Sequence, residues 1–231
     1  LIDRTAFSMA QQDVRYYLNG MLFEVTPRHL RTVATDGHRL AMATYESELP
    51  GVRSDLQVIL PRKGVLELLR LLQNPDEDVR LVLGGNHFHA ITPDFTFTSK
   101  LVDGKFPEYE RVVPRDADKR VLGPRVELKE ALARTAILSN EKYRGVRLVL
   151  EDGNLQILAN NPEQEEAEEQ VGVSYSGSRV EIGFNVSYLI DVLSVLTSEE
   201  VRFLLSDGSR SVLVQDPGRE DALYVVMPMR L

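Results

Sequence analysis

The sequence of 231 residues contains no cysteine and no tryptophan. The absence of cysteine excludes disulfide bonds, thiolate metal ligands and a cysteine nucleophile in one step. The absence of tryptophan removes one common anchor of protein interfaces. No apolar run reaches the roughly 18 residues of a membrane-spanning helix, and the first residues lack the pattern of a secretion signal. These absences favour a cytoplasmic protein without a membrane partner.

The charge of the chain is negative overall and uneven along the sequence. A formal net charge of −8 argues against a protein that coats nucleic acid with its whole surface, but it allows one basic face on an acidic body. Five glutamates crowd residues 163–169, whereas six arginines and lysines fall within residues 125–147. Two solvated faces that bind nothing are the alternative left open by composition.

The sequence repeats itself at a spacing of about 125 residues. Residues 20–36 align without a gap with residues 145–161, with matches such as Gly20 to Gly145 and Leu30 to Leu155. Two later segments align at slightly smaller shifts, as expected if only loops differ in length. A repeat of more than about 100 residues is too long for a solenoid and indicates a duplicated domain. We therefore predict two tandem domains, residues 1–109 and 110–231.

Hydrophobic periodicity predicts an α+β fold with helix, strands, helix and strands in each copy. The predicted helices cover residues 1–10, 61–72, 128–138 and 186–196, the last one capped by Asn185. The predicted strands cover residues 16–25, 30–34, 39–44, 58–60, 79–83, 87–91, 95–101, 147–150, 155–159 and the segment from 201 to the end. Residues 102–124, rich in proline, glycine and charge, are predicted to link the copies.

No group of residues has the pattern of an active site. His38 follows Asp36, which suggests a general base and makes a hydrolase the alternative function. Against it, the chain has no Gly-x-Ser-x-Gly sequence, and the matching residues 161–163 of the second copy include no histidine. His87 and His89 would share a strand face but lack a third metal ligand. We expect no catalytic residue, no cofactor and no metal.

The remaining features favour binding. If the helices of both copies share one side, cationic side chains on or beside them would contact a phosphate backbone without reading bases. They are Arg15, Arg62, Lys63, Arg70, Lys129, Arg134, Lys142 and Arg144. An apolar groove is expected where Leu18, Leu40 and Val226 meet near the apolar chain end. Met227 and Met229 suit such a groove because methionine adapts to varied partners.

Several longer strings carry a family resemblance. They are DVRYYLNG at 13–20, TDGHRL at 35–40, PRKG at 61–64, KLVDGKFP at 100–107, SNEK at 139–142 and MPMRL at 227–231. With these strings, essentially the whole chain resembles the bacterial DNA sliding clamp, the beta subunit of DNA polymerase III. The resemblance implies a non-catalytic processivity factor that tethers the polymerase to DNA.

The resemblance also implies the fold and the assembly. Clamps of this family have three copies of one module per subunit, and two subunits close head to tail as a homodimer ring around duplex DNA. This chain resembles the second and third modules only, and it begins at Leu1 without methionine, so we expect a piece of a longer protein. Ring closure pairs the first module of one subunit with the third module of its neighbour. The contact in this chain would lie around Ile137 and Leu138.

The partner site implied by the resemblance receives a short extended peptide. Such peptides are carried by the DNA polymerase III alpha subunit, the clamp loader delta subunit, translesion polymerases and repair proteins. The matching residues are Arg15, Tyr17, Leu18, Thr35, Gly37, His38, Arg39, Leu40, Pro107, Arg111, Val112, Asn185, Tyr188, Ser211, Val225, Val226, Met227, Pro228, Met229 and Arg230. Ser209 departs from the pattern, because an apolar residue is expected there.

For duplex DNA, the positions similar to the family are Gln12, Arg62 and Lys63. Lys129, Arg134 and Lys142 are added from charge alone. Because a ring holds DNA by topology, each contact need not be strong, and we expect this chain alone to bind DNA poorly. A duplicated domain that only associates with itself is a third possible function.

Overall fold

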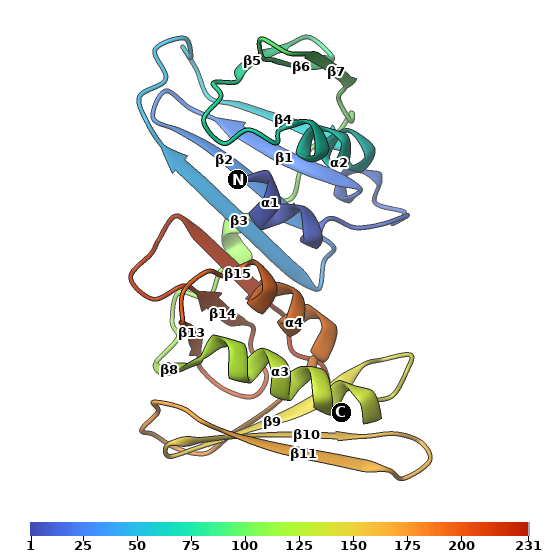
Figure 1. The fold of residues 1–231 in the computed structure, drawn as a ribbon, viewed down its shortest axis with the longest axis vertical. Helices are drawn as coiled ribbons and strands as arrows, with labels where there is room; N and C mark the ends of the chain where they lie inside the picture. The colour runs from blue at the N-terminus through green and yellow to red at the C-terminus, as the bar shows by residue number, and fades with distance from the viewer. Residues whose placement is uncertain (231) are drawn as a thin grey trace. The chain divides into compact units, whose positions relative to one another are not determined.

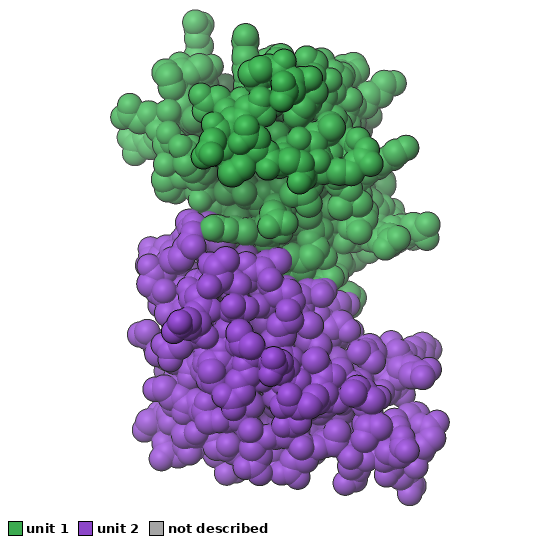
Figure 2. Space-filling view, viewed as in Figure 1, with its two compact units in different colours: residues 1–109 green, residues 110–231 purple. Residues whose placement is uncertain are grey.

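The computed structural model describes residues 1–230. The chain divides into two compact units between Tyr109 and Glu110 (Figure 2), here called unit 1 and unit 2. Each unit has its own sheets and helices, as Figure 1 shows. Among the described residues, no helix has the length and apolar character needed to span a bilayer.

Unit 1 contains two helices and two antiparallel sheets. Helix α1 (Ile2–Thr5) continues into a 3₁₀ turn, and helix α2 (Arg62–Leu71) follows the last strand of the first sheet. The first sheet has the order β4-β1-β2-β3, with β1 at Gly20–Val25, β2 at His29–Thr35, β3 at Arg39–Glu46 and β4 at Leu56–Pro61. The second has the order β5-β6-β7, with β5 at Arg80–Gly84, β6 at His87–Ile91 and β7 at Thr96–Lys100.

Unit 2 has the same plan with one extra strand. Helices α3 (Arg125–Thr135) and α4 (Val186–Val195) pack against each other. The first sheet has the order β12-β9-β10-β11, with β9 at Gly145–Glu151, β10 at Asn154–Asn160, β11 at Glu166–Gly172 and β12 at Val180–Asn185. The second has the order β8-β13-β14-β15, with β8 at Lys119–Pro124, β13 at Glu200–Leu205, β14 at Val212–Gln215 and β15 at Ala222–Val226.

The repeat predicted from the sequence is present in the fold. Strand β2 begins at residue 29 and ends at residue 35, and β10 begins at 154 and ends at 160, which is a shift of 125 at both ends. Helices α2 and α4 are related by 124 at both ends, 62 to 186 and 71 to 195. The strand order β4-β1-β2-β3 also matches β12-β9-β10-β11. The predicted α+β class and duplication are therefore confirmed.

Some predicted elements were wrong in extent or missing. Tyr16–Leu18 forms a 3₁₀ turn rather than the start of a strand, because the Leu18 N–H donates to the Arg15 carbonyl at 2.8 Å. Strand β8 lies inside the segment predicted as a linker. Strand β11 lies in the glutamate-rich run, where exposed Glu166 and Glu168 alternate with the partly buried Ala167.

Local chemistry explains two element boundaries. The Asn185 side chain accepts a hydrogen bond from the Ser187 N–H at 2.9 Å, which caps α4 as predicted. Helix α3 begins at Arg125, three residues before the predicted start, and the Arg125 guanidinium donates to the Leu193 and Ser198 carbonyls at 3.2 and 2.6 Å. These long-range partners were not visible in local periodicity.

Candidate functional site

In unit 1, residues 36–38 form a tight loop between β2 and β3. Asp36 Oδ1 accepts hydrogen bonds from the main-chain N–H groups of His38 and Arg39 at 2.9 and 3.0 Å. Gly37 has φ of +88°, a conformation that side chains other than hydrogen rarely adopt. The Asp36 carboxylate therefore shapes the loop, and the hydrolase interpretation of Asp36 and His38 gains no support from this geometry.

Arg15 lies against this loop. Its guanidinium donates to the Asp36 carbonyl at 3.3 Å, and a Cβ on Gly37 would lie only 3.0 Å from Arg15 Nη2. Asp13 holds the same guanidinium with two hydrogen bonds of 3.0 and 2.8 Å. The Arg15 hydrogen bonds lower the pKa of Asp13 to about 2. The structure thus brings together Arg15 and Gly37, two residues far apart in the sequence.

Thr35 and Arg39 are engaged within unit 1. Thr35 Oγ1 donates to the Arg39 carbonyl at 2.6 Å and accepts from the Gly37 N–H at 3.1 Å. The Arg39 guanidinium donates to the Phe7 carbonyl at 2.9 Å and to Asp36 Oδ2 at 3.2 Å. These two residues therefore fix the loop geometry, whatever else they contact.

The other predicted peptide residues of unit 1 differ in exposure. Leu18 and Leu40 are buried, so little of either side chain is accessible on this unit. Tyr17 is half-buried, whereas His38 and Pro107 are exposed. An incoming peptide could thus contact the half-buried ring of Tyr17 and the exposed rings of His38 and Pro107 on this unit.

In unit 2, the apolar chain end is a buried strand with an exposed continuation. Val225 and Val226 of β15 are buried, and Met227 is 42% exposed. The Met229 N–H donates to the Gly183 carbonyl at 2.8 Å, which fixes the segment after β15 beside the end of β12. The predicted strand near the chain end is confirmed as far as Val226.

This attachment places Met229 close to predicted residues of α4. Gly183 is two residues before Asn185, the cap of α4, and Tyr188 is half-buried in the first turn of the same helix. Half-buried aromatic and thioether groups beside a fixed backbone segment are typical of peptide-binding surfaces. The structure therefore places Met229 beside β12, the strand that leads into Asn185 and Tyr188 of the predicted set.

A groove of about 990 Å³ runs from Met229 and Arg230 across unit 2. Its walls include Tyr143 and Leu158 and the exposed face of β11. Tyr143 is 56% exposed and was not predicted as a site residue. The signal available in the sequence was its position directly after the SNEK string, but nothing local showed that its ring would reach the chain end.

The remaining predicted peptide residues of unit 2 are more scattered. Arg111 and Val112 are exposed in the 3₁₀ turn Tyr109–Val112, and Ser211 is half-buried before β14. Ser209 Oγ donates to Asp207 Oδ1 at 2.6 Å in an exposed turn. The departure noted at Ser209 is thus accommodated by a local hydrogen bond.

The DNA candidates of unit 1 lie close together. Arg62 and Lys63 begin α2, and Arg62 donates from its main-chain N–H to the Asn19 carbonyl at 2.9 Å. The Asn19 side chain exchanges hydrogen bonds of 2.9 and 2.8 Å with the main chain of Asp13. Gln12 is exposed in this loop, with φ of +56°. Asn19, which was not predicted as a site residue, therefore positions the Gln12 loop beside the start of α2.

The three cations predicted from charge in unit 2 differ from one another. Lys129 is half-buried on α3. Arg134 binds the Glu169 carboxylate with hydrogen bonds of 2.6 and 3.2 Å, so its charge is already compensated. Lys142 lies outside the helix, with its Nζ 5.1 Å from the centre of the Tyr143 ring. Of these three, Lys129 is therefore the candidate that lies on a helix and whose charge is not paired with a carboxylate among the described contacts.

Ile137 and Leu138 follow α3 in a 3₁₀ turn. Ile137 is 77% exposed, and Leu138 is partly buried. Strand β11 ends its sheet and carries the exposed residues Glu166 and Glu168. The open edge of β11 offers unpaired main-chain groups to a partner strand, and Ile137 offers an exposed aliphatic side chain on the same unit.

Within residues 1–230, no three histidine or acidic residues lie close enough together to hold a metal ion. The rings of His87 and His89 share a face of β6 at 6.2 Å, as predicted. His89 Nδ1 is hydrogen-bonded with Thr98 Oγ1 at 2.9 Å. The two histidines thus stack on each other, and His89 is also held by a neighbouring strand.

Comparison with known proteins agrees with this architecture. The protein-family model for the central domain of the DNA polymerase III beta subunit matches residues 1–108. The family model for its C-terminal domain matches residues 110–230. The fold and these two matches define a two-domain portion of a DNA clamp. The chain belongs to the beta sliding clamp family, the beta subunit of DNA polymerase III.

The relatives are longer than this chain. It is 64% identical to the beta sliding clamp of Pseudomonas aeruginosa over 231 residues and 56% identical to that of Escherichia coli K12 over 233 residues. In both cases it is covered completely and spans 63% of the relative. A crystal structure of the Pseudomonas aeruginosa clamp bound to griselimycin superposes with a TM-score of 0.97 at 64% identity, covering 100% of this chain and 62% of the other.

Proposed function

We propose that this chain serves as the partner-docking and DNA-contacting portion of a sliding clamp. In that role it is a processivity factor without a catalytic site, and it acts in the cytoplasm. The observation that carries the proposal is the chain end of unit 2, where Met229 is fixed beside the cap of α4 and borders an open groove. A rigid, partly apolar surface of this kind can receive an extended peptide at low entropic cost.

The proposed peptide partners are the DNA polymerase III alpha subunit, the clamp loader delta subunit, translesion polymerases and repair proteins. In unit 1 the proposed contacts centre on Arg15, Tyr17 and His38, and in unit 2 on Tyr188 and Met229. The griselimycin complex of the Pseudomonas aeruginosa clamp supports the presence of a ligand-binding surface on this family member. Tyr143 is added to the proposed set because it lines the groove with Met229.

The test is a fluorescence anisotropy titration of a labelled clamp-binding peptide against the chain. Met229→Ala and Tyr143→Ala are each expected to weaken binding about tenfold or more, as truncation of a central apolar contact does. Tyr45→Ala is the matched control, because Tyr45 on β3 is 57% exposed and Tyr143 is 56% exposed. Equal affinities for all three variants would remove the site assignment.

For duplex DNA, the proposed contacts are Gln12, Arg62, Lys63 and Lys129. Arg62 and Lys63 occupy the first turn of α2, where positive charge opposes the helix dipole and does not stabilise the helix. Cations kept at such a position favour an external anion such as phosphate. We expect weak binding of this chain to DNA, with an affinity that falls steeply as salt is added.

The proposed assembly is the homodimer ring of the family, with Ile137 and Leu138 at the subunit contact. The exposure of Ile137 and the open edge of β11 support this proposal. Size measurement of this chain mixed with an intact clamp provides the test. Ile137→Asp is expected to abolish a mixed complex, whereas Val126→Asp, an exposed substitution on α3, should leave it intact.

A further inference from the structure

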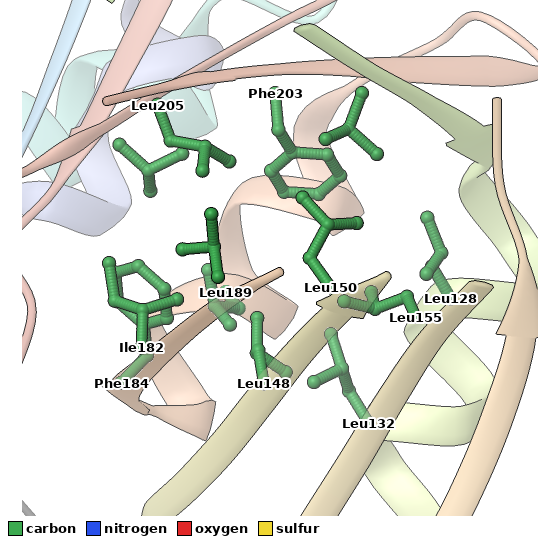
Figure 3. A pocket seen from close by; sticks show the side chains of 13 residues that line it. Leu128, Leu132, Leu148, Leu150, Leu155, Ile182, Phe184, Leu189, Phe203 and Leu205 are labelled. Atoms are coloured by element: carbon green, nitrogen blue, oxygen red, sulfur yellow. The ribbon is translucent and has the colours of Figure 1, made fainter. Parts of the chain in front are cut away.

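The core of unit 2 contains a cavity of about 40 Å³ (Figure 3). Side chains from both sheets and from both helices converge on it, with Phe203 and Leu205 of β13 on one side and Leu132 and Leu148 on the other. The full lining is Val121, Leu128, Leu132, Leu148, Leu150, Leu155, Val180, Ile182, Phe184, Leu189, Phe203, Leu205 and Val212.

The chemistry of this lining excludes a stable water. Every lining residue is valine, leucine, isoleucine or phenylalanine. A buried water needs two to four polar partners, and cavities lined only by such groups stay dry. The space therefore offers dispersion contacts to an apolar guest and no hydrogen bonds to a polar one.

The internal repeat shows which core positions differ between the two units around this space. Leu148 of β9 corresponds to Phe23 of β1, since Leu148 pairs with Ile182 as Phe23 pairs with Val58. On the second sheet, Arg202 pairs with Gln215 as Arg80 pairs with Ile91. Three positions before Gln215 and Ile91 stand Val212 and Phe88, respectively.

At these two positions unit 1 has phenylalanines, and unit 2 has Leu148 and Val212. The same repeat gives unit 2 Phe184 and Phe203 where unit 1 has Leu60 and Leu81. The rings of Phe23 and Phe88 are in contact, with centroids 5.1 Å apart. Their counterparts Leu148 and Val212 both line the cavity. The rings therefore stand at different positions in the two cores, and Phe184 and Phe203 of unit 2 leave a volume beside Leu148 and Val212 unfilled.

We propose that this cavity is a binding site for a small apolar ligand of about the size of a xenon atom. An engineered apolar cavity of about 150 Å³ binds benzene or xenon, and the cavity in unit 2 has roughly a quarter of that volume. It therefore admits a single compact apolar group and rejects an aromatic ring. The site is separate from the peptide and DNA surfaces described above.

The test is methyl NMR of the 231-residue chain under increasing xenon pressure. The methyl signals of Leu148, Leu189 and Val212 are expected to shift and to saturate. Those of Val65 and Leu68, buried in the core of unit 1, should stay in place and serve as the internal control. Shifts of equal size in both units, or no saturable shift in unit 2, would overturn the proposal.

Filling the cavity provides the second measurement. Leu148→Phe restores one ring of the unit 1 arrangement and is expected to weaken xenon binding at least tenfold, with Val126→Phe on the exposed side of α3 as the matched control. Val212→Ile, which adds one methylene, repeats the test if the larger ring disturbs folding. Undiminished xenon shifts in folded filled variants would show that the ligand binds elsewhere and contradict the assignment.

Discussion

Unit 1 packs the rings of Phe23, Phe88 and Phe97 against one another, whereas unit 2 carries its core rings Phe184 and Phe203 at other positions of the repeat and leaves a cavity beside them. Phe88 contacts Phe23 at 5.1 Å and Phe97 at 6.4 Å between ring centroids. In unit 2 the positions of Phe23 and Phe88 are Leu148 and Val212, beside the cavity. Both units nevertheless keep the same strand order. The alternation of apolar and polar residues therefore specifies this fold, and the identity of each core residue adjusts its packing density.

A second difference concerns a buried charge. Glu24 of β1 has a partly buried side chain that accepts hydrogen bonds from Gln57 at 2.7 Å, from Tyr109 at 3.1 Å and from Arg31 at 3.2 Å. At the repeat distance of 125 residues, unit 2 has Val149. Because Tyr109 is the last residue of unit 1, this network anchors the end of the unit to its first sheet. Unit 2 closes the same position with an apolar side chain alone.

The largest expected effect comes from breaking the aromatic cluster. Phe88→Ala should lower the free energy of unfolding of unit 1 by about 3–5 kcal/mol, since it removes a fully buried ring and leaves a cavity. Val212→Ala at the corresponding position of unit 2 should cost less, because fewer atoms are removed beside an existing void. Denaturant unfolding with a probe in each unit measures both. Equal losses would contradict the proposed difference in packing.

Removing the charge network of unit 1 ranks second. Glu24→Ala should destabilise unit 1 by about 1–3 kcal/mol, because Arg31 and the Tyr109 hydroxyl lose a partner in a partly buried place. Glu46→Ala on β3 removes an exposed carboxylate and serves as the control. Thermal unfolding of both variants provides the comparison, and a control as unstable as Glu24→Ala would show that burial of the charge is unimportant.

Filling the unit 2 core should have a smaller effect of opposite sign. Leu148→Phe is expected to raise the stability of unit 2 by about 0.5–2 kcal/mol, as cavity-filling substitutions commonly do. The reverse exchange, Phe23→Leu, should lower the stability of unit 1. Calorimetry on the two variants measures the exchange directly. A destabilised Leu148→Phe protein would mean that the surrounding side chains leave the ring no room.

The smallest expected effect is a change in pH dependence. Burial would raise the pKa of Glu24, but hydrogen bonds from Gln57, His29 and Tyr109 and the charge of Arg31 outweigh it and lower the pKa below 4.5. A lowered folded-state pKa means that the stabilisation is present above the unfolded pKa and is lost as pH falls through the folded pKa. Glu24→Gln should therefore flatten the acid side of the stability profile of unit 1. Melting temperatures between neutral pH and about pH 3 test this, with unit 2 as the reference.

The elements with strong periodicity were predictable from the sequence. Strand β2 and helix α2 have clear apolar faces, and their repeats at shifts of 125 and 124 reinforced them. Strand β11 was not predicted, because its acidic residues hid a two-residue alternation that only pairing with β10 makes visible. The prediction of a strand at Tyr16–Leu18 was wrong, because a run of bulky residues does not distinguish a strand from a 3₁₀ turn.

The candidate site was predictable mainly as strings and only partly as geometry. The string at 13–20 pointed to Arg15, but its contact with Gly37 depends on a turn 21 residues further on. The role of Asn19 depends on a bond to the start of α2, and the compensation of Arg134 depends on Glu169, 35 residues away. Tyr143 was missed for the same reason. Long-range hydrogen bonds of this kind leave no local pattern in a single sequence.

The void in unit 2 also has a mechanical consequence. When a folded domain with an internal void unfolds, solvent fills the space and the total volume of the system decreases. Hydrostatic pressure should therefore shift the equilibrium of unit 2 towards the unfolded chain, and Leu148→Phe should make that unit less compressible. The cavity would in this way make one half of the chain respond more strongly to compression than the other.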